Sequence, residues 1–437
     1  MEICQFLFNK GAILVLKFAE MDSKTLQEYR AGLLKRYEDF KSQSLKYNMS
    51  RGVPCKEQLD LSMGMLDITD YKSDDSDFRN YGGIDGIPEA KQLFAELLEA
   101  ELDEVIVGGN SALNMIYDTI ARAMSFGVLG SEVAWGKLPK VKILCPSPGY
   151  DRHFAICELF GIEMIVVDMK SDGPDIDAVE KIVSEDETVK GILCVPKYSN
   201  PDGITYSDEV VDRLARMKTK AKDFRIFWDN AYAVHHLYSK GDTLKNILKA
   251  CKDAGNEDRV FVYFSTSKIS FPGAGVAAMA TSKANASMIK KQLSIQMIGP
   301  DKMNQFRHVR FFKNKDNIEA HMRKHAEIIE PKFSAVLDIL SAELGGKEIA
   351  WWKKPNGGYF ISLNTLDGCA KEVVTMTAEA GVLITPAGAT FPYGKDPRDR
   401  NIRIAPSFPS VNELKNAIEI FCVCIQITSI NKLLLKK

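Results

Sequence analysis

Short apolar runs alternate with amphipathic segments through the middle of this chain. Seven of these runs have the length and composition of buried strands, at 105–107, 141–145, 164–167, 191–195, 225–228, 260–264 and 276–280. Between them, apolar residues recur at three- and four-residue steps over 111–126, 175–184 and 207–218, which predicts helices. Strands that alternate with helices indicate a mostly parallel sheet with helices on both faces. The pattern therefore predicts a large α/β domain.

The pattern changes on both sides of this region. Before it, apolar residues at helical spacing follow Asp22, a suitable N-cap, and a loop segment and a helix at 88–98 come next. After it, a long helical pattern over 318–344 precedes strand-like runs and further helices, at 359–363, 370–380, 401–405 and from residue 410. Mixed strands and helices after a long connecting helix predict a smaller α+β domain. We expect an N-terminal segment at 22–80 that packs with the small domain, a large domain at 81–315 and a small domain at 316–437.

The first 21 residues precede the first capped helix. Their apolar run, Ala12–Leu16, is much shorter than the 18 or so residues that a membrane span needs. Lys17 and Glu20 follow it, and no small-residue cleavage pattern comes after them. We expect residues 1–21 to be a disordered extension, residues 1–20 to be dispensable with Met21 as an alternative start, and the protein to have no membrane contact.

Composition and charge narrow the class of protein. The chain has 437 residues, of which 45% are apolar and 26% charged, as in ordinary globular proteins. Single cores stop growing at about 250–300 residues, which favours two lobes. With 57 basic and 58 acidic residues, no bulk charge attracts nucleic acid. Nine cysteines in apolar runs, without a regular framework, are typical of reduced thiols in a cytoplasmic protein.

Two residues at the ends of predicted strands have the chemistry of a cofactor site. Lys268 follows the apolar run 260–264 among small hydroxyl residues, and such a lysine can lose its proton and form a Schiff base with an aldehyde cofactor. Most lysines, however, are solvated surface charges. Asp229 ends the run that begins at residue 225, and a carboxylate beside a pyridine nitrogen keeps that nitrogen protonated. An aspartate at this place could equally cap a helix.

Two turns at strand ends complete the candidate site. Asn200 lies in a turn after the run 191–195, where its amide could point into a cleft, although a plain surface turn would look similar. The run 105–107 leads into Gly108-Gly109-Asn110-Ser111 and then a helix, and free N–H groups at such a helix start suit a phosphate. The G-x-G-x-x-G fingerprint is absent, so the phosphate need not belong to a dinucleotide.

These motifs, in order over about residues 22–425, resemble the fold-type I enzymes that depend on pyridoxal phosphate (PLP), specifically the class I aminotransferase superfamily. The resemblance implies the PLP-transferase type I fold, with a seven-stranded sheet in the large domain, and a homodimer. It implies that Lys268 is the catalytic lysine and that the cofactor is bound by Gly109, Asn110, Ser111, Tyr150, Asn200, Asp229, Tyr232, Ser265, Lys268 and the partner's Tyr81. It implies substrate contacts from Gly52, Asn200 and Arg403, whose guanidinium fork would clamp the α-carboxylate.

Two longer runs are similar to a narrower bacterial subgroup, named aspartate aminotransferase type Ic. They are residues 146–154 and 228–236. This similarity implies ping-pong transfer of an amino group from aspartate or another acidic amino acid to a 2-oxo acid such as 2-oxoglutarate. Arg51 and Lys302 are the candidates for a distal carboxylate. One position departs from the superfamily: Val276 stands where most relatives have a phosphate-binding arginine, eight residues after the lysine.

Other functions on the same scaffold stay open at this point. They are aminotransferases for alanine or aromatic amino acids, and a PLP lyase or racemase, because a fold does not fix a reaction. A PLP-sensing transcription regulator would need a DNA-binding domain, and the N-terminal region has no helix-turn-helix pattern.

Several histidine and cysteine pairs could suggest a metal, but core packing is the better interpretation. They are Cys422 with Cys424, His235 with His236, and His321 with His325, and none has further ligands at metal-binding spacing. We therefore expect no metal. Arg307, His308 and Arg310 are expected to form a solvated helix face rather than a nucleic-acid site. Lys197, in the Asn200 loop, is expected to be structural or solvated.

Overall fold

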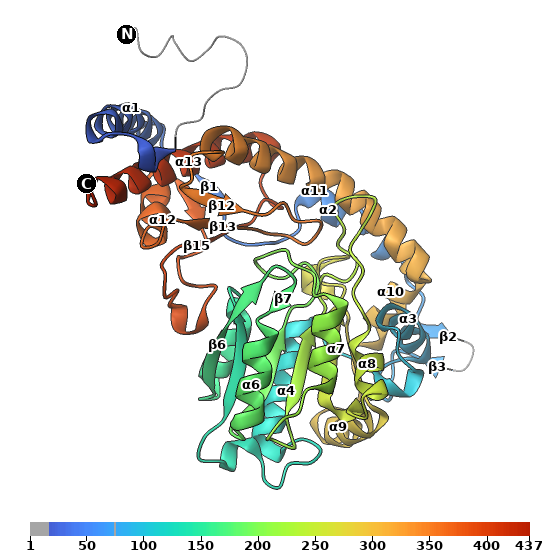
Figure 1. Cartoon of the computed structure of the whole chain (residues 1–437). Helices are drawn as coiled ribbons and strands as arrows, with labels where there is room; N and C mark the ends of the chain where they lie inside the picture. The colour runs from blue at the N-terminus through green and yellow to red at the C-terminus, as the bar shows by residue number, and fades with distance from the viewer. Residues whose placement is uncertain (1–16, 74–75) are drawn as a thin grey trace.

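An eight-stranded sheet forms the centre of the larger part of the molecule (Figure 1). The computed structural model describes residues 17–73 and 76–437. The strands, in spatial order, are β4 (Val105–Val107), β11 (Ala277–Thr281), β10 (Val260–Ser265), β9 (Arg225–Asp229), β8 (Val189–Cys194), β5 (Lys142–Ser147), β6 (Glu163–Lys170) and β7 (Gly173–Pro174). Only β11 and β7 run antiparallel to their neighbours. The sheet is therefore mostly parallel, as predicted.

The prediction of seven strands is wrong by one. All seven predicted strands are present, with small shifts at their ends. The eighth, β7, has two residues, which turn back to pair with Met169 and Lys170 at the end of β6. A two-residue strand has no room for a periodic pattern, so the hydrophobic signal could not reveal it.

Helices cover both faces of this sheet, and each face has its own apolar core. On one face lie α3 (Pro88–Leu98), α6 (Ile176–Glu185), α7 (Asp208–Arg216) and α8 (Ile247–Asp253). On the other lie α4 (Ala112–Phe126), α5 (Asp151–Leu159) and α9 (Lys283–Gln296). Successive strand residues point to opposite faces, so Trp228 belongs to the first core and Phe227 to the second. Burial on both faces explains why the strands read as continuous apolar runs.

A second group of elements surrounds a separate apolar core. A three-stranded antiparallel sheet combines β12 (Ala350–Trp352), β13 (Ile361–Thr365) and β15 (Asn401–Ile404). The helices around it are α1 (Ser23–Ser42), α11 (Lys315–Leu344), α12 (Ala370–Glu379) and α13 (Val411–Leu434). The N-terminal segment joins through β1 (Tyr47–Met49), which pairs in parallel with β14 (Val382–Ile384). Residues from both ends of the described chain thus share one core.

Helix α13 is apolar along its length for a packing reason. It is long and apolar enough to cross a membrane by length and composition, but 72% of its most apolar window is buried inside the protein. It packs against α1, α11 and α12, so it has little exposed face. Cys422 and Cys424 are both fully buried in this core as free thiols, which confirms the core-packing interpretation of the pair.

Ordered structure begins before Asp22. The short helix η1 (Phe18–Glu20) lies against α13, and the Phe18 side chain, which packs edge-on against Tyr29 of α1, is only 1% exposed. The Phe18 N–H donates to the Lys347 carbonyl at 3.3 Å. The expectation of a disordered extension is therefore wrong for residues 17–21, because one aromatic residue without periodic neighbours leaves no sequence signal. Residues 1–16 lie outside the described residues. Asp22 does cap α1, accepting from the Thr25 N–H at 2.9 Å.

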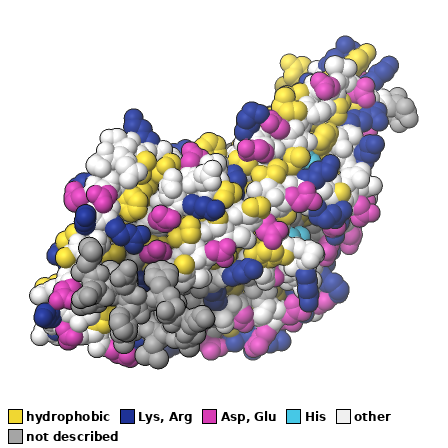
Figure 2. Space-filling model, turned by 90° about the horizontal axis from the view of Figure 1, so that it is seen from above, with side chains coloured by type: hydrophobic (Ala, Val, Ile, Leu, Met, Phe, Trp, Pro, Cys, Tyr) yellow, Lys and Arg dark blue, Asp and Glu magenta, His cyan; other side chains and the backbone are white. Residues whose placement is uncertain are grey.

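The face of the molecule seen in Figure 2 carries basic and acidic side chains interspersed. This distribution agrees with a net charge of −1. Helix α10 (Lys302–Phe312) carries the cluster expected to form a solvated face, and that expectation is wrong for His308. His308 is 1% exposed, and its Nε2 lies 2.9 Å from the Ser270 hydroxyl. Arg310 on the same helix is exposed beside Asp70.

Buried histidines of α11 connect it to the turn after β10. His321 Nε2 lies 2.9 Å from the Ile269 carbonyl, and His325 Nε2 lies 3.1 Å from His321 Nε2. Gln58, in α2 (Lys56–Asp60), bonds to His325 Nδ1 at 3.0 Å and to the Tyr359 hydroxyl at 2.9 Å. Across residues 17–73 and 76–437, no group of three His, Cys, Asp or Glu side chains could hold a metal ion. The histidines act here as hydrogen-bonding core residues next to Lys268.

The burial of Phe18 predicts a large loss of stability on truncation. Phe18→Ala should lower the free energy of unfolding by about 3 kcal/mol, because it leaves a cavity against α1 and α13. Chemical unfolding followed by circular dichroism measures this loss. Lys17→Ala, which removes only exposed ion pairs, should cost less than about 1 kcal/mol. Equal, small effects of the two variants would show that η1 adds nothing to the core.

The buried histidines predict a loss of stability in acid. Burial, and next the charge of His321, lower the pKa of His325 to about 3, whereas an unfolded histidine titrates near 6.5. Between these values the unfolded chain binds a proton that the folded chain does not, so stability falls as the pH drops below about 6.5. His325→Gln should flatten this dependence, by at most about 1.4 kcal/mol per pH unit. Urea unfolding at pH 7.5 and 5.5 tests this, with Arg323→Gln, exposed on the same helix, as the control. Identical slopes for the variant and the wild type would contradict it.

Candidate active site

Three neighbouring parallel strands deliver the candidate residues to one edge of the sheet. In the register of β8, β9 and β10, Cys194 pairs with Trp228, and Asp229 pairs with Tyr263. The segments that follow these strands carry Asn200, Tyr232 and Lys268. In open α/β sheets, ligands bind beyond this carboxyl edge. Figure 1 shows the small-domain elements lying over the same end of the sheet.

Lys268 lies in the turn that follows β10, with its side chain partly buried. Its Nζ is 5.1 Å from the centroid of the Tyr232 ring and makes no hydrogen bond or ion pair with any residue that the structure describes. Burial lowers the pKa of Lys268, and the negative charge of Asp229 opposes that shift. A desolvated amine without a partner is favoured in its neutral, nucleophilic form.

Asp229 ends β9 and is 4% exposed. One carboxylate oxygen, Oδ2, lies 3.0 Å from His153 Nε2 in α5, whereas the other, Oδ1, is buried without a hydrogen-bond partner among the residues that the structure describes. An unsatisfied buried carboxylate oxygen is costly unless a donor meets it. The Tyr150 ring packs edge-on against His153, with 4.9 Å between ring centroids. The arrangement suits a protonated ring nitrogen opposite Oδ1.

A glycine turn precedes α4. Gly109 has a left-handed φ of 71°, and the Ser111 hydroxyl caps the helix by accepting from the Asn114 N–H at 3.3 Å. The Ser267 hydroxyl donates to the Asn110 carbonyl at 2.8 Å, and the Ser265 hydroxyl lies 3.2 Å from Ser267 Oγ. Hydroxyls and helix N–H groups thus gather at one point, a combination that suits a phosphate.

Residue 275 belongs to another segment, which lies against this turn, and only glycine fits there. A Cβ there would lie 2.7 Å from the Asn110 carbonyl oxygen and 3.0 Å from Ser267 Oγ. The following residue, Val276, is 2% exposed and its side chain packs in the core, so it places no positive charge at the turn. Arg152 lies instead beside Ser111, in a pocket of about 360 Å³.

Arg403 of β15 is held by side chains from three other segments. Its guanidinium donates from Nη1 to Asp151 Oδ1 at 2.9 Å and to Asn200 Oδ1 at 3.1 Å. Its Nε donates to Thr385 Oγ1 at 3.2 Å. Arg403 is only 6% exposed, yet Nη2 makes no hydrogen bond with a described residue. The free edge of the fork could take a carboxylate.

Gly52 and Arg403 both lie next to the same aromatic ring, that of Phe360. The Arg403 guanidinium carbon lies 4.9 Å from the centroid of the Phe360 ring. A Cβ at residue 52 would lie 2.5 Å from the same ring, so a larger residue would displace it. Of the two candidates for a distal carboxylate, Arg51 is exposed nearby, whereas Lys302 donates its Nζ to the Tyr81 carbonyl at 2.9 Å. Tyr81 itself is 79% exposed.

Sequence analysis missed several residues of this site. They are Asp151, His153, Phe360, Thr385 and Gly275. Asp151 and His153 stand in the run 146–154, but their partners are 252 and 76 residues away along the chain. No local pattern indicates such pairings. Only their position next to Tyr150 could have singled them out.

Comparisons with known proteins agree on the family. The model of the aspartate aminotransferase family matches residues 21–437. An aspartate aminotransferase of Corynebacterium glutamicum is 42% identical over 421 residues, which cover 94% of this chain and 97% of that protein. A crystal structure of an aspartate transaminase from the same species is similar with a TM-score of 0.93 and 41% identity, over 96% of this chain and 99% of that one.

A more distant structure shares the fold. It is the α-aminoadipate aminotransferase of Thermus thermophilus in complex with N-(5'-phosphopyridoxyl)-L-leucine, with a TM-score of 0.71, 16% identity and coverage of 94% of this chain and 98% of that one. The family match and the 42% identity extend over nearly the whole chain. The chain therefore belongs to the aspartate aminotransferase family and is a transaminase.

Proposed function

We propose that this transaminase moves the amino group of aspartate, or of another acidic amino acid, to a 2-oxo acid such as 2-oxoglutarate, with PLP as its cofactor. The observation that carries the proposal is a pair of unpartnered polar groups on adjacent strands. They are Asp229 Oδ1 at the end of β9 and Lys268 Nζ after β10. A cofactor with an aldehyde and a protonated ring nitrogen would satisfy both.

Bound PLP would supply the aldehyde that accepts the amino group and a ring that withdraws electrons from the substrate α-carbon. Asp229 would hold the proton on the ring nitrogen, and His153 would fix the orientation of Asp229. Tyr232 and Asn200 would bond the phenolic oxygen, and Tyr150 would cover the ring. The phosphate would be held by Gly109, Asn110, Ser111 and Ser265, with the partner's Tyr81 in a homodimer.

Lys268 would have two tasks. Burial lowers its pKa, which favours the neutral amine that would attach covalently to the cofactor. When substrate releases it, the same amine is the group placed to remove the α-proton and to return a proton to the acceptor carbon. The ring of Tyr232, 5.1 Å away, limits the space in which Nζ moves.

Substrate would be held at its α-carboxylate by Arg403 and Asn200, over the Phe360 ring and next to Gly52. The ion pair with Asp151 keeps the guanidinium in place and partly offsets its positive charge within the site. A dicarboxylic donor is supported by the Corynebacterium glutamicum relative, which is named an aspartate aminotransferase. Arg51 is the candidate for the distal carboxylate because it is exposed beside Gly52 and is in no ion pair with a described residue.

Loss of the lysine should abolish the reaction but not all cofactor binding. Lys268→Ala should reduce turnover by more than about 10⁴-fold, because it removes both the covalent anchor and the general base. PLP should still bind, since the Asp229 side chain and the Gly109–Ser111 turn are intact. A coupled assay of 2-oxo acid formation measures the first effect, and absorbance of the dialysed protein measures the second.

The control for this experiment is Lys249→Ala, whose side chain is 72% exposed on α8 and which should behave as the wild type. Borohydride reduction of the wild type, followed by peptide mapping, should place the cofactor on Lys268. Attachment to another lysine, or near-normal turnover of Lys268→Ala, would disprove the site assignment.

Substrate preference should follow charge. Aspartate should exceed alanine and phenylalanine in kcat/KM by about tenfold or more, because a second charge-assisted hydrogen bond is worth about 1.5–3 kcal/mol. Steady-state rates with each donor and 2-oxoglutarate test this. Equal or faster turnover of phenylalanine would rule out the acidic donor while leaving transamination itself intact.

A further inference from the structure

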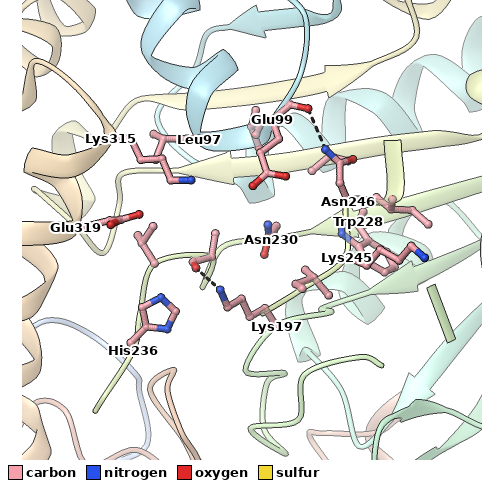
Figure 3. A pocket seen from close by; sticks show the side chains of 16 residues that line it. Leu97, Glu99, Lys197, Trp228, Asn230, His236, Lys245, Asn246, Lys315 and Glu319 are labelled. Atoms are coloured by element: carbon pink, nitrogen blue, oxygen red, sulfur yellow. Dashed lines mark hydrogen bonds between the residues drawn. The ribbon is translucent and has the colours of Figure 1, made fainter. Parts of the chain in front are cut away.

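A second cavity lies on the other side of the loops that carry the active-site residues (Figure 3). Its volume is about 150 Å³, and Trp228, Asn230 and Lys197 form part of its wall. Side chains alternate along β9, so Asp229 faces His153 of α5 whereas Trp228 belongs to the core on the opposite face of the sheet. The cavity and the active site are therefore separate spaces that share two loops.

Lys197 is a buried cation on which carboxylates, those of Asp242, Glu319 and Glu99, act only from beyond ion-pair distance. Its side chain is 8% exposed, and its Nζ donates to the Ala233 carbonyl at 2.8 Å. It forms no ion pair with a described residue. Burial lowers the pKa of Lys197 to about 8, so at neutral pH most molecules still carry the charge. A buried charge left unpaired is costly, and an anion in the cavity would compensate it.

Three more charged side chains reach the cavity without pairing. Lys315 and Glu319 come from the first turns of α11, and Glu99 comes from the left-handed residue that ends α3. None of the three forms an ion pair or side-chain hydrogen bond with a described residue. Figure 3 shows Lys315 Nζ and the carboxylates of Glu99 and Glu319 pointing into the space above Lys197 and Asn230. Asn230 Oδ1 is also buried without a partner.

The cavity holds both positive and negative side chains, which together indicate a ligand that carries both charges. Two amines, of Lys197 and Lys315, match one carboxylate. The acceptors on Glu99, Glu319 and Asn230 match the N–H groups of one ammonium, of which a primary amine offers three and a secondary amine two, enough for the two carboxylates. A simple anion would leave the carboxylates unmatched, and a simple cation would leave the lysines unmatched. In another protein an engineered cavity of about 150 Å³ holds benzene, a molecule with as many non-hydrogen atoms as alanine.

We propose that this cavity is a second binding site, outside the active site, for the zwitterionic backbone of a small α-amino acid. The ligand's carboxylate lies between Lys197 and Lys315, and its ammonium lies between Glu319, Glu99 and Asn230. The site does not depend on the proposed substrate or on the cofactor. A ligand bound in this cavity contacts the two loops that also carry Asn200 and Asp229.

Sarcosine is the probe, because its secondary amine forms no neutral imine with an aldehyde and it has the size of alanine. Titration calorimetry of the holoenzyme at pH 7 should show one saturable site per chain. Absorbance of the cofactor at about 360–430 nm should stay unchanged, because the ligand does not enter the active site. Lys315→Met and Glu319→Gln should each weaken binding at least about tenfold, which is about 1.4 kcal/mol.

Lys249→Met, exposed on α8, is the matched control and should bind sarcosine as the wild type does. Thermal melting of each variant checks its folding. The proposal is overturned if sarcosine shows no saturable binding, if both pocket variants bind it unchanged, or if binding shifts the cofactor absorbance. Transamination rates are measured separately, so failure of this site and failure of the proposed reaction are distinguishable.

Discussion

The parallel register of β8, β9 and β10 is the constraint on which the rest of the structure depends. It makes three strands end side by side, so that Asn200, Asp229 and Lys268 meet although they are far apart in the sequence. Side chains alternate along a strand, so neighbouring residues of β9 face opposite sides of the sheet. This alternation separates the candidate active site from the cavity beside Trp228. A one-residue slip of β9 would exchange Asp229 with a neighbour and dismantle both.

Unsatisfied polar groups lie at both proposed ligand sites. Among the described residues, Asp229 Oδ1 and Lys268 Nζ have no hydrogen-bond partner on one side of the sheet, and Asn230 Oδ1 has none on the other, where Lys197 is in no ion pair. The buried His321 and His325, in contrast, are hydrogen-bonded, to the Ile269 carbonyl and to Gln58. The apolar cores on both faces of the sheet stabilise a protein that carries these unpaired groups.

Sequence alone predicts the parts of this molecule that have a local signal. The seven strands are visible because burial on both faces makes each a continuous apolar run, and Asp22 and Ser410 are recognisable caps. Asp229 is identifiable because it ends a strand, and Lys268 because it lies in the turn directly after one. What cannot be predicted depends on distance along the chain: the Arg403–Asp151 and Asp229–His153 pairs join residues without a shared pattern. A single buried residue such as Phe18, or a two-residue strand such as β7, cannot show a periodic pattern of apolar residues.

The position of α13 in the chain has a consequence for how the protein is made. All strands of the large sheet lie between residues 105 and 281, so that sheet can assemble while the ribosome is still translating the rest. The second core cannot, because it combines Phe18 and Leu26 with α13 residues as far as Ile430. Until α13 emerges, the apolar faces of α1 and α11 lack their main partner. During that interval the nascent chain is a natural client for chaperones, and slowing translation before residue 411 should lengthen its exposure to aggregation.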